Sequence, residues 1–307
     1  MIYSAAFKAK ARAVLQQHWQ TALLIALIVN LPTLLVQGIS AFTGNDLMIR
    51  LEALLVDASR GTAAVDSFPD ALRAILSEPG ILAMSALGVL AWLVTPALSL
   101  GMDHWTLDRI RGGESPVSTV FSRLNIFFKG VGLRLLIALK ILLWMLPGIA
   151  VMALSIVLLR NAEGASREAI LSAANTSVTL IWFGMLLMLV LGIMGYLHYA
   201  MADFILADEP GERVLSCARR SKEMMKGRRG QLMSLLLSFI LWYILISFVT
   251  AFVSGIAGDV VGLMLQMLGS LFLSVYMLTS EGVFFEALRT APLQTQPEEQ
   301  EPDGDDA

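Results

Sequence analysis

Six long apolar runs constrain the fold of this chain more than any other feature of the sequence. They cover residues 20–41, 81–102, 131–159, 177–201, 232–253 and 260–280. Crossing the hydrocarbon core of a bilayer takes about 20 mostly apolar residues, and each run meets that length. The runs are continuous and do not alternate with polar residues, which favours helices over barrel strands. The sequence therefore predicts an all-α integral membrane protein, a bundle of six transmembrane helices.

The composition agrees with this class and excludes several kinds of site. Hydrophobic residues make up 56% of the chain and charged residues 15%, whereas about a quarter of a soluble domain is charged. The single cysteine, Cys217, rules out a disulfide within the chain, and the three histidines lack the spacing of metal ligands. We therefore expect no metal and no cofactor.

The distribution of Lys and Arg predicts the orientation in the membrane. Fifteen of them lie in the N-terminal segment, 103–130, 203–230 and the C-terminal tail, and five lie in the alternate connections. Positive residues concentrate on the cytoplasmic side, so both termini are expected in the cytoplasm. The first run is longer than the apolar region of a signal peptide and no clear cleavage site follows it, so it is expected to stay as an anchor.

Three segments outside the spans have their own predicted character. Residues 1–19 are expected to form an amphipathic N-terminal helix that lies at the headgroups of the inner side. The outer loop 42–80 contains two apolar-faced stretches, 46–59 and 69–77, expected to lie along the outer membrane surface or to cap the bundle. Residues 291–307 carry six acidic residues and no base. Such a polar, acidic segment predicts a disordered tail, so the six-span membrane domain covers residues 20–290.

A basic segment, 209–229, separates the fourth and fifth spans and is predicted to be a helix. Asp208 fits its cap, Pro210 its first turn and Gly227 its end. One face is apolar and the other cationic, and its candidate contacts to an anionic surface are Arg219, Arg220, Lys222, Lys226, Arg228 and Arg229. No aromatic platform or reading module accompanies the charge, so nucleic acid is not expected. Two roles of this helix stay open and are compatible: it binds anionic lipid, or its charge only keeps this side of the protein in the cytoplasm.

Polar residues within the spans form a second candidate site. Ionisable groups at membrane depth are expensive and therefore mark functional candidates. The candidates are Lys140, Asp203, Glu281 and His198. We predict that Lys140 pairs with Asp203 in the inner half of the bundle; the alternative is that Lys140 extends toward the headgroups.

The run 196–242 resembles domain-of-unknown-function family 975, a family of uncharacterised bacterial membrane proteins. The resemblance rests on the turn of Asp208 and Pro210, the Ser-Arg-rich stretch 218–221, the sequence Met225-Lys226-Gly227 and the helix start LSFILW at 237–242. Weaker matches are AKARAVLQQHW, LDRIRGG followed by LLWMLPGI, and YMLTSEGVFFEAL. The turn 209–211 is shorter than the family's pattern suggests, and the acidic tail lies outside it. The resemblance implies a multi-pass protein of the bacterial inner membrane and carries no established reaction.

Enzyme, transporter and interaction module are the function classes to compare. No GxSxG, HExxH or Gly-rich phosphate loop is present, so an enzyme is not expected. The leading hypothesis is a non-catalytic membrane scaffold or interaction module whose basic helix engages anionic headgroups or an acidic partner. A protein partner or a homo-oligomer stays open. The alternative is a small-solute or lipid transporter with a polar site near Lys140 and Asp203.

Overall fold

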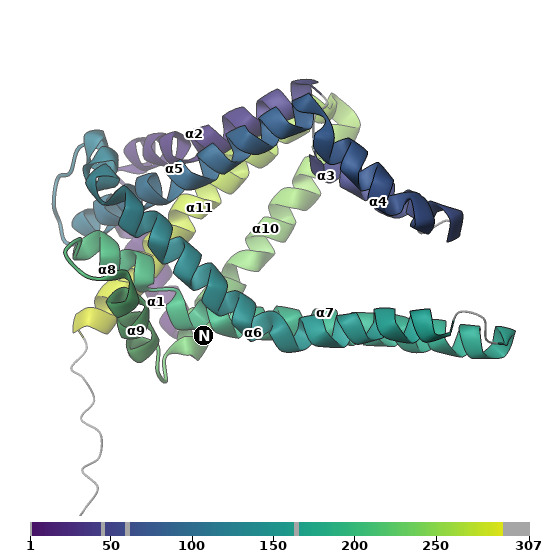
Figure 1. Ribbon diagram of the computed structural model, residues 1–307. Coiled ribbons are helices and arrows are strands. Elements are labelled where there is room, and N and C mark those ends of the chain that lie inside the picture. The colour runs from purple at the N-terminus through teal and green to yellow at the C-terminus, as the bar shows by residue number, and fades with distance from the viewer. Residues whose placement is uncertain (1, 44–46, 59–61, 163–165, 291–307) are drawn as a thin grey trace, which may run out of the picture.

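The computed structural model describes residues 2–43, 47–58, 62–162 and 166–290, and within these ranges every regular element is a helix (Figure 1). In chain order the helices are α1 (Ile2–Leu15), α2 (Trp19–Thr43), α3 (Leu47–Ala58), α4 (Thr62–Ser77), α5 (Pro79–Ile110), the 3₁₀ helix η1 (Val117–Ile126), α6 (Phe127–Asn161), α7 (Arg167–Tyr199), α8 (Ala202–Asp208), α9 (Val214–Met224), α10 (Arg229–Ala257) and α11 (Asp259–Thr290).

Six of these helices are long and apolar enough to cross a membrane, namely α2, α5, α6, α7, α10 and α11. The predicted all-α bundle of six spans is therefore confirmed. Several helices continue beyond the apolar runs, because α5 extends to Ile110 and α11 to Thr290. These extensions carry charged residues into the body of the protein.

The spans separate into two groups that diverge from a common base. Helices α6 and α7 pack closely along each other as a long hairpin, while α2, α5, α10 and α11 form the second group. Figure 1 shows the two groups meeting near α1, α8 and α9, where the hairpin contacts α5, α8 and α9. We call this region, which also holds the C-terminal ends of α5 and α11, the basic end.

Glycines allow the two helices of the hairpin to lie against each other. A Cβ atom on Gly148 would lie 2.8 Å from the carbonyl oxygen of Gly184 and 2.7 Å from the backbone nitrogen of Met188. Both obstacles are backbone atoms of α7, which cannot turn away as a side chain can. Close packing of small residues is the usual way in which helices associate in lipid, and Pro147 lies within α6 without ending it.

The largest buried core lies at the basic end. Helix α8 is at its centre, with Ala202, Phe204, Ile205, Leu206 and Ala207 all buried. A second core joins α2, α5, η1 and α11 around Trp105. Large apolar side chains elsewhere on α6, α7, α10 and α11 are exposed, as expected of surfaces that face lipid.

Two helices at the basic end differ from their predicted form. Helix α9 begins at Val214, inside the predicted range 209–229, and the residues before it form a turn. Arg213 is its N-cap, so the prediction that Asp208 caps it is wrong; Asp208 ends α8. The apolar face of α1, expected against headgroups, packs on α10 and α11, with Ala11 and Leu15 buried. The position of α1 differs because protein surface is available nearby to cover its apolar side chains.

Candidate functional site

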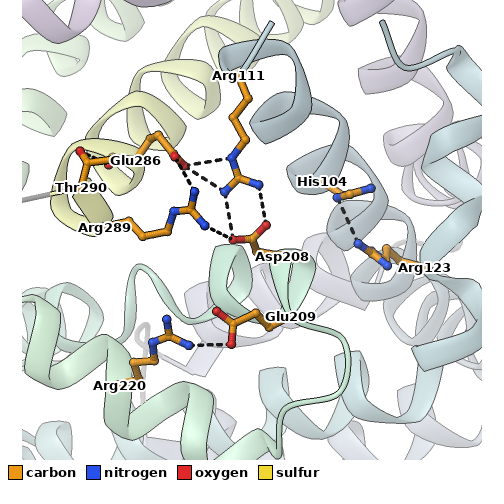
Figure 2. A network of polar contacts seen from close by, with 9 residues as sticks. All are labelled: His104, Arg111, Arg123, Asp208, Glu209, Arg220, Glu286, Arg289 and Thr290. Atoms are coloured by element: carbon orange, nitrogen blue, oxygen red, sulfur yellow. Dashed lines mark hydrogen bonds and ion pairs between the residues drawn. The ribbon is translucent and has the colours of Figure 1, made fainter. Parts of the chain in front are cut away.

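An ion-pair network ties three helices together at the basic end (Figure 2). Arg111 at the end of α5 donates to Asp208 of α8 at 2.6 and 2.9 Å and to Glu286 of α11 at 3.0 Å. Arg289 lies 3.4 Å from Asp208 and 3.0 Å from Glu286. The hydrogen bonds that Arg111 donates to Asp208 and Glu286 raise the pKa of its guanidinium above the ordinary value. The network contains two cations and two anions, so its charges balance and it offers no unpaired charge to a ligand. We call this network, which joins α5, α8 and α11, the clamp.

A pocket of about 490 Å³ lies between α6 and α9. Four cationic side chains line it, and no lining residue is acidic; the lining is Lys140, Tyr199, Arg213, Leu215, Ser216, Ala218, Arg219 and Lys222. The ammonium of Lys140 lies 5.4 Å from the centroid of the Tyr199 ring. We call this cavity the basic pocket. The positive charge of its lining makes it suitable for an anion.

An apolar groove adjoins the basic pocket along α6 and α7. It has a volume of about 390 Å³ and is lined by Lys140, Leu143, Trp144, Pro147, Leu191 and Tyr199. Lys140 and Tyr199 belong to both linings, so the basic pocket and the groove adjoin each other. A cationic pocket therefore lies next to an apolar groove on the surface of a membrane-spanning helix.

The six predicted contacts to an anionic surface have different positions. Arg219 and Lys222 line the basic pocket, and Lys226 is exposed in the turn after α9. Arg220 is paired with Glu209 at 2.7 Å, and that hydrogen bond raises the pKa of Arg220. Arg228 and Arg229 are half-buried at the start of α10. The structure thus concentrates the free charge of α9 on the side that faces α6.

Helix α9 is held by its apolar side, which the sequence placed against lipid. Cys217, Ala218 and Met225 are buried in the protein. The hydroxyl of Ser221 donates to the carbonyl of His198 at 3.1 Å and accepts from the amide of Met201 at 3.2 Å. These two bonds satisfy backbone groups at the break between α7 and α8 and fix α9 beside it.

A second cavity, of about 430 Å³, lies between α5, α6, α7, α8 and α11. Its polar lining includes Asp103, Arg134, Asp203 and Glu281, and we call it the acidic cavity. Arg134 lies 3.2 Å from Asp203, so the predicted pairing of Lys140 with Asp203 is wrong. Lys140 points into the basic pocket instead, which lies on the other side of Tyr199.

Sequence reasoning brought Asp203 and Glu281 together and missed their two charged neighbours. Asp103 directly follows the second apolar run and was counted with the loop, although α5 continues past it. Arg134 lies in the first turns of the third run, where its charge was overlooked in favour of Lys140. A charged residue within a few positions of a span's end was the available signal.

His198 belongs to neither cavity. Its Nδ1 atom lies 2.5 Å from the carbonyl oxygen of Met194, and its ring packs 5.1 Å from that of Trp144. Only 4% of the residue is exposed. The residue therefore contributes to packing between α6 and α7 and not to a polar cluster.

Within the described ranges, no group of three or more His, Cys, Asp or Glu side chains is arranged to hold a metal ion. The thiol of Cys217 is fully buried, and this burial raises its pKa to about 11. A thiol with so high a pKa is a poor nucleophile and a poor metal ligand at neutral pH.

Comparison with known proteins places this architecture in a family. A model described as "Protein of unknown function (DUF975)" matches residues 1–292. Neither the curated proteins nor the solved structures contain a significant match. The match covers all six spans, α9 and both cavities, and it confirms the resemblance seen in the sequence. The chain therefore belongs to the DUF975 family.

Proposed function

We propose that this protein is a non-catalytic membrane protein that binds an anionic phospholipid through the basic pocket, with the basic end facing the cytoplasm of a bacterium. The observation that carries the proposal is the position of a cationic pocket directly beside an apolar groove, with Lys140 and Tyr199 lining both. A phospholipid has the same two parts in the same order, a charged headgroup and an apolar chain.

The chemistry of the lining supports this assignment. Arg213, Arg219 and Lys222 would surround a headgroup phosphate from the side of α9, and Lys140 from the side of α6. Each nearby Lys or Arg contributes on the order of 1 kcal/mol to binding at an anionic surface. Tyr199 lines both the basic pocket and the groove. A tyrosine is typical of the membrane interface, where its apolar ring and its polar hydroxyl both find partners.

The adjoining surface of α6 is suited to an acyl chain. Leu139 and Leu143 are exposed beside the groove, and the groove is lined mainly by apolar side chains. The inside-positive distribution of Lys and Arg supports a cytoplasmic position for this end. Anionic lipids of the cytoplasmic leaflet would therefore meet the pocket directly.

Lipid binding by the purified protein tests the proposal. The double substitution Arg219→Gln and Lys222→Gln removes two of the four cations, which predicts a loss of about 2 kcal/mol, or roughly 30-fold in affinity. Native mass spectrometry with phosphatidylglycerol measures this loss, and phosphatidylcholine provides the neutral comparison. Arg167→Gln, an exposed site at the far tip of the hairpin, is the matched control and should have no effect.

Two results would overturn the proposal. One is equal binding of phosphatidylglycerol and phosphatidylcholine by the unaltered protein. The other is equal binding of phosphatidylglycerol by the double variant and the control. Raising the salt concentration should weaken the specific binding, because exposed charges are screened.

A further inference from the structure

We infer that the acidic cavity is a binding site for a small organic cation, an ammonium group attached to an apolar body. This site differs from the basic pocket, with which it shares only Tyr199, because its lining is acidic. The inference rests on two buried carboxyl groups that form no ion pair among the described residues, on aromatic walls and on the position of the cavity between membrane-spanning helices.

The cavity is lined by three carboxyl groups, those of Asp103, Asp203 and Glu281, and by one guanidinium, that of Arg134. Arg134 is paired with Asp203 at 3.2 Å and lies 3.4 Å from the hydroxyl of Ser99. Among the described residues neither Asp103 nor Glu281 forms an ion pair, and only 4% and 7% of these residues are exposed. A buried ionised carboxylate without a partner is destabilising. A cation entering the cavity would supply the missing partner.

Glu281 is the observation that points most directly to a ligand. Its Oε1 atom is buried and has no hydrogen-bond partner among the described residues, although the side chain lines the cavity. Buried polar atoms are satisfied in the great majority of cases. The neighbouring Gly282 lets α11 approach α5 closely, since a Cβ atom there would lie 3.2 Å from the side chain of Thr106. The packing therefore holds Glu281 in a site that gives its oxygen nothing to bind.

The walls favour an organic cation over a bare metal ion. Trp92, Tyr196, Tyr199 and Phe204 all line the cavity, and aromatic faces attract ammonium groups. Its volume of about 430 Å³ lies within the usual range of small-molecule sites. No metal-binding arrangement of carboxylates is present in the part of the chain that the structure describes.

The cavity is reached from the lipid-facing side of the bundle. Trp92 on α5 and Tyr196 on α7 are both exposed as well as lining it. A cation with an apolar body concentrates at membrane interfaces, so it could enter between these helices. The competing explanation for the unpaired carboxyl groups is that they are protonated, because a protonated carboxyl group needs no cation.

Phenyltrimethylammonium and tert-butylbenzene provide a matched pair of probes, because they share a shape and differ in charge. The full-length protein in phosphatidylcholine nanodiscs is titrated with each, with the change in tryptophan fluorescence and the heat of binding as readouts. We expect saturable binding of phenyltrimethylammonium and at least tenfold weaker binding of tert-butylbenzene. Absence of binding by phenyltrimethylammonium, or equal binding of the two probes, would overturn the inference.

Two variants assign the binding to the cavity. Glu281→Gln and Asp103→Asn keep the size of each side chain and remove its charge, and each should weaken phenyltrimethylammonium at least tenfold. Glu223→Gln, at an exposed position of α9, is the control and should bind like the unaltered protein. Unchanged binding by both cavity variants would contradict the inference.

A stability measurement separates loss of a ligand site from loss of the fold. Without ligand, Glu281→Gln should melt at the same temperature as the unaltered protein or a higher one, since it removes an uncompensated buried charge. A variant that bound weakly because it was misfolded would have a lower melting temperature. In that case the binding of phenyltrimethylammonium by Asp103→Asn tests whether the cavity is the binding site. The Arg219→Gln and Lys222→Gln double variant should bind phenyltrimethylammonium normally, which keeps this site distinct from the lipid pocket.

Discussion

Replacing Arg111 by glutamine should lower the free energy of unfolding by about 2–3 kcal/mol. The guanidinium joins Asp208 and Glu286, whose side chains are only 12% exposed, while that of Arg111 is 31% exposed. Hydrogen bonds to charged groups contribute about 1.5–3 kcal/mol, and fully buried pairs more. The expected loss stays below that of a fully buried pair, because Arg289 remains to neutralise part of the charge of Asp208 and Glu286.

Thermal unfolding in detergent, followed by loss of the monodisperse peak in size-exclusion chromatography, measures the effect. A change of this size corresponds to a melting temperature lower by about 5 °C in a chain of this length. The matched control is Arg73→Gln, because Arg73 pairs with Asp70 within one helix turn and both side chains are more than four-fifths exposed (83% and 85%). Such a surface pair contributes about 0–1 kcal/mol.

A double-mutant cycle with Asp208→Asn tests whether the loss comes from this contact. The sum of the stability losses of the two single variants should exceed the loss of the double variant, because each single substitution removes the same interaction. If Arg111→Gln melts at the same temperature as Arg73→Gln, or if the two changes are additive, the network is not the clamp described above.

Two further predictions concern packing. Cys217 should react with maleimide at pH 8 only after the protein is unfolded, because a pKa raised to about 11 by burial leaves roughly one thiol in a thousand ionised; labelling of the folded protein at the rate of a free thiol would contradict this. Gly148→Ala should destabilise the hairpin by about 1–3 kcal/mol in the same melting assay, because the methyl group meets backbone atoms of Gly184 and Met188. Gly38→Ala is its control, since a Cβ atom there meets nothing within 4 Å, and the helix propensity of alanine makes it neutral or stabilising.

The spans were predictable because their signal is local. A continuous apolar run of sufficient length has few alternatives to a membrane helix, and all six runs correspond to such helices. The fourth predicted span ends at residue 201, next to the break between α7 and α8, but the sequence does not specify the break itself, because apolar residues continue on both sides of Asp203. The hydroxyl of Ser221, twenty or more positions away, accepts from the amide of Met201 and donates to the carbonyl of His198, which satisfies the backbone there.

The charged sites depended on helix rotation, which the sequence does not specify. Arg134 and Lys140 are six residues apart on α6, so at about 100° per residue they point in directions about 120° apart. One reaches Asp203 in the acidic cavity and the other reaches the basic pocket. Depth in the membrane was enough to predict that Asp203 and Glu281 lie in one cluster. It was not enough to predict that Arg134, and not Lys140, pairs with Asp203.

The diverging hairpin gives the protein the geometry of a lever. Helices α6 and α7 pack mainly on each other, and their contacts with other described helices lie near the basic end. The stretch of α6 from Leu146 to Asn161 is about 24 Å long at 1.5 Å per residue. The fulcrum lies beside the two cavities, since Arg134, Lys140 and Tyr199 all belong to the hairpin. A rotation of about 10° at the base of this stretch would displace its far end by about 4 Å, so a small shift beside the cavities would be enlarged at the far end of the hairpin.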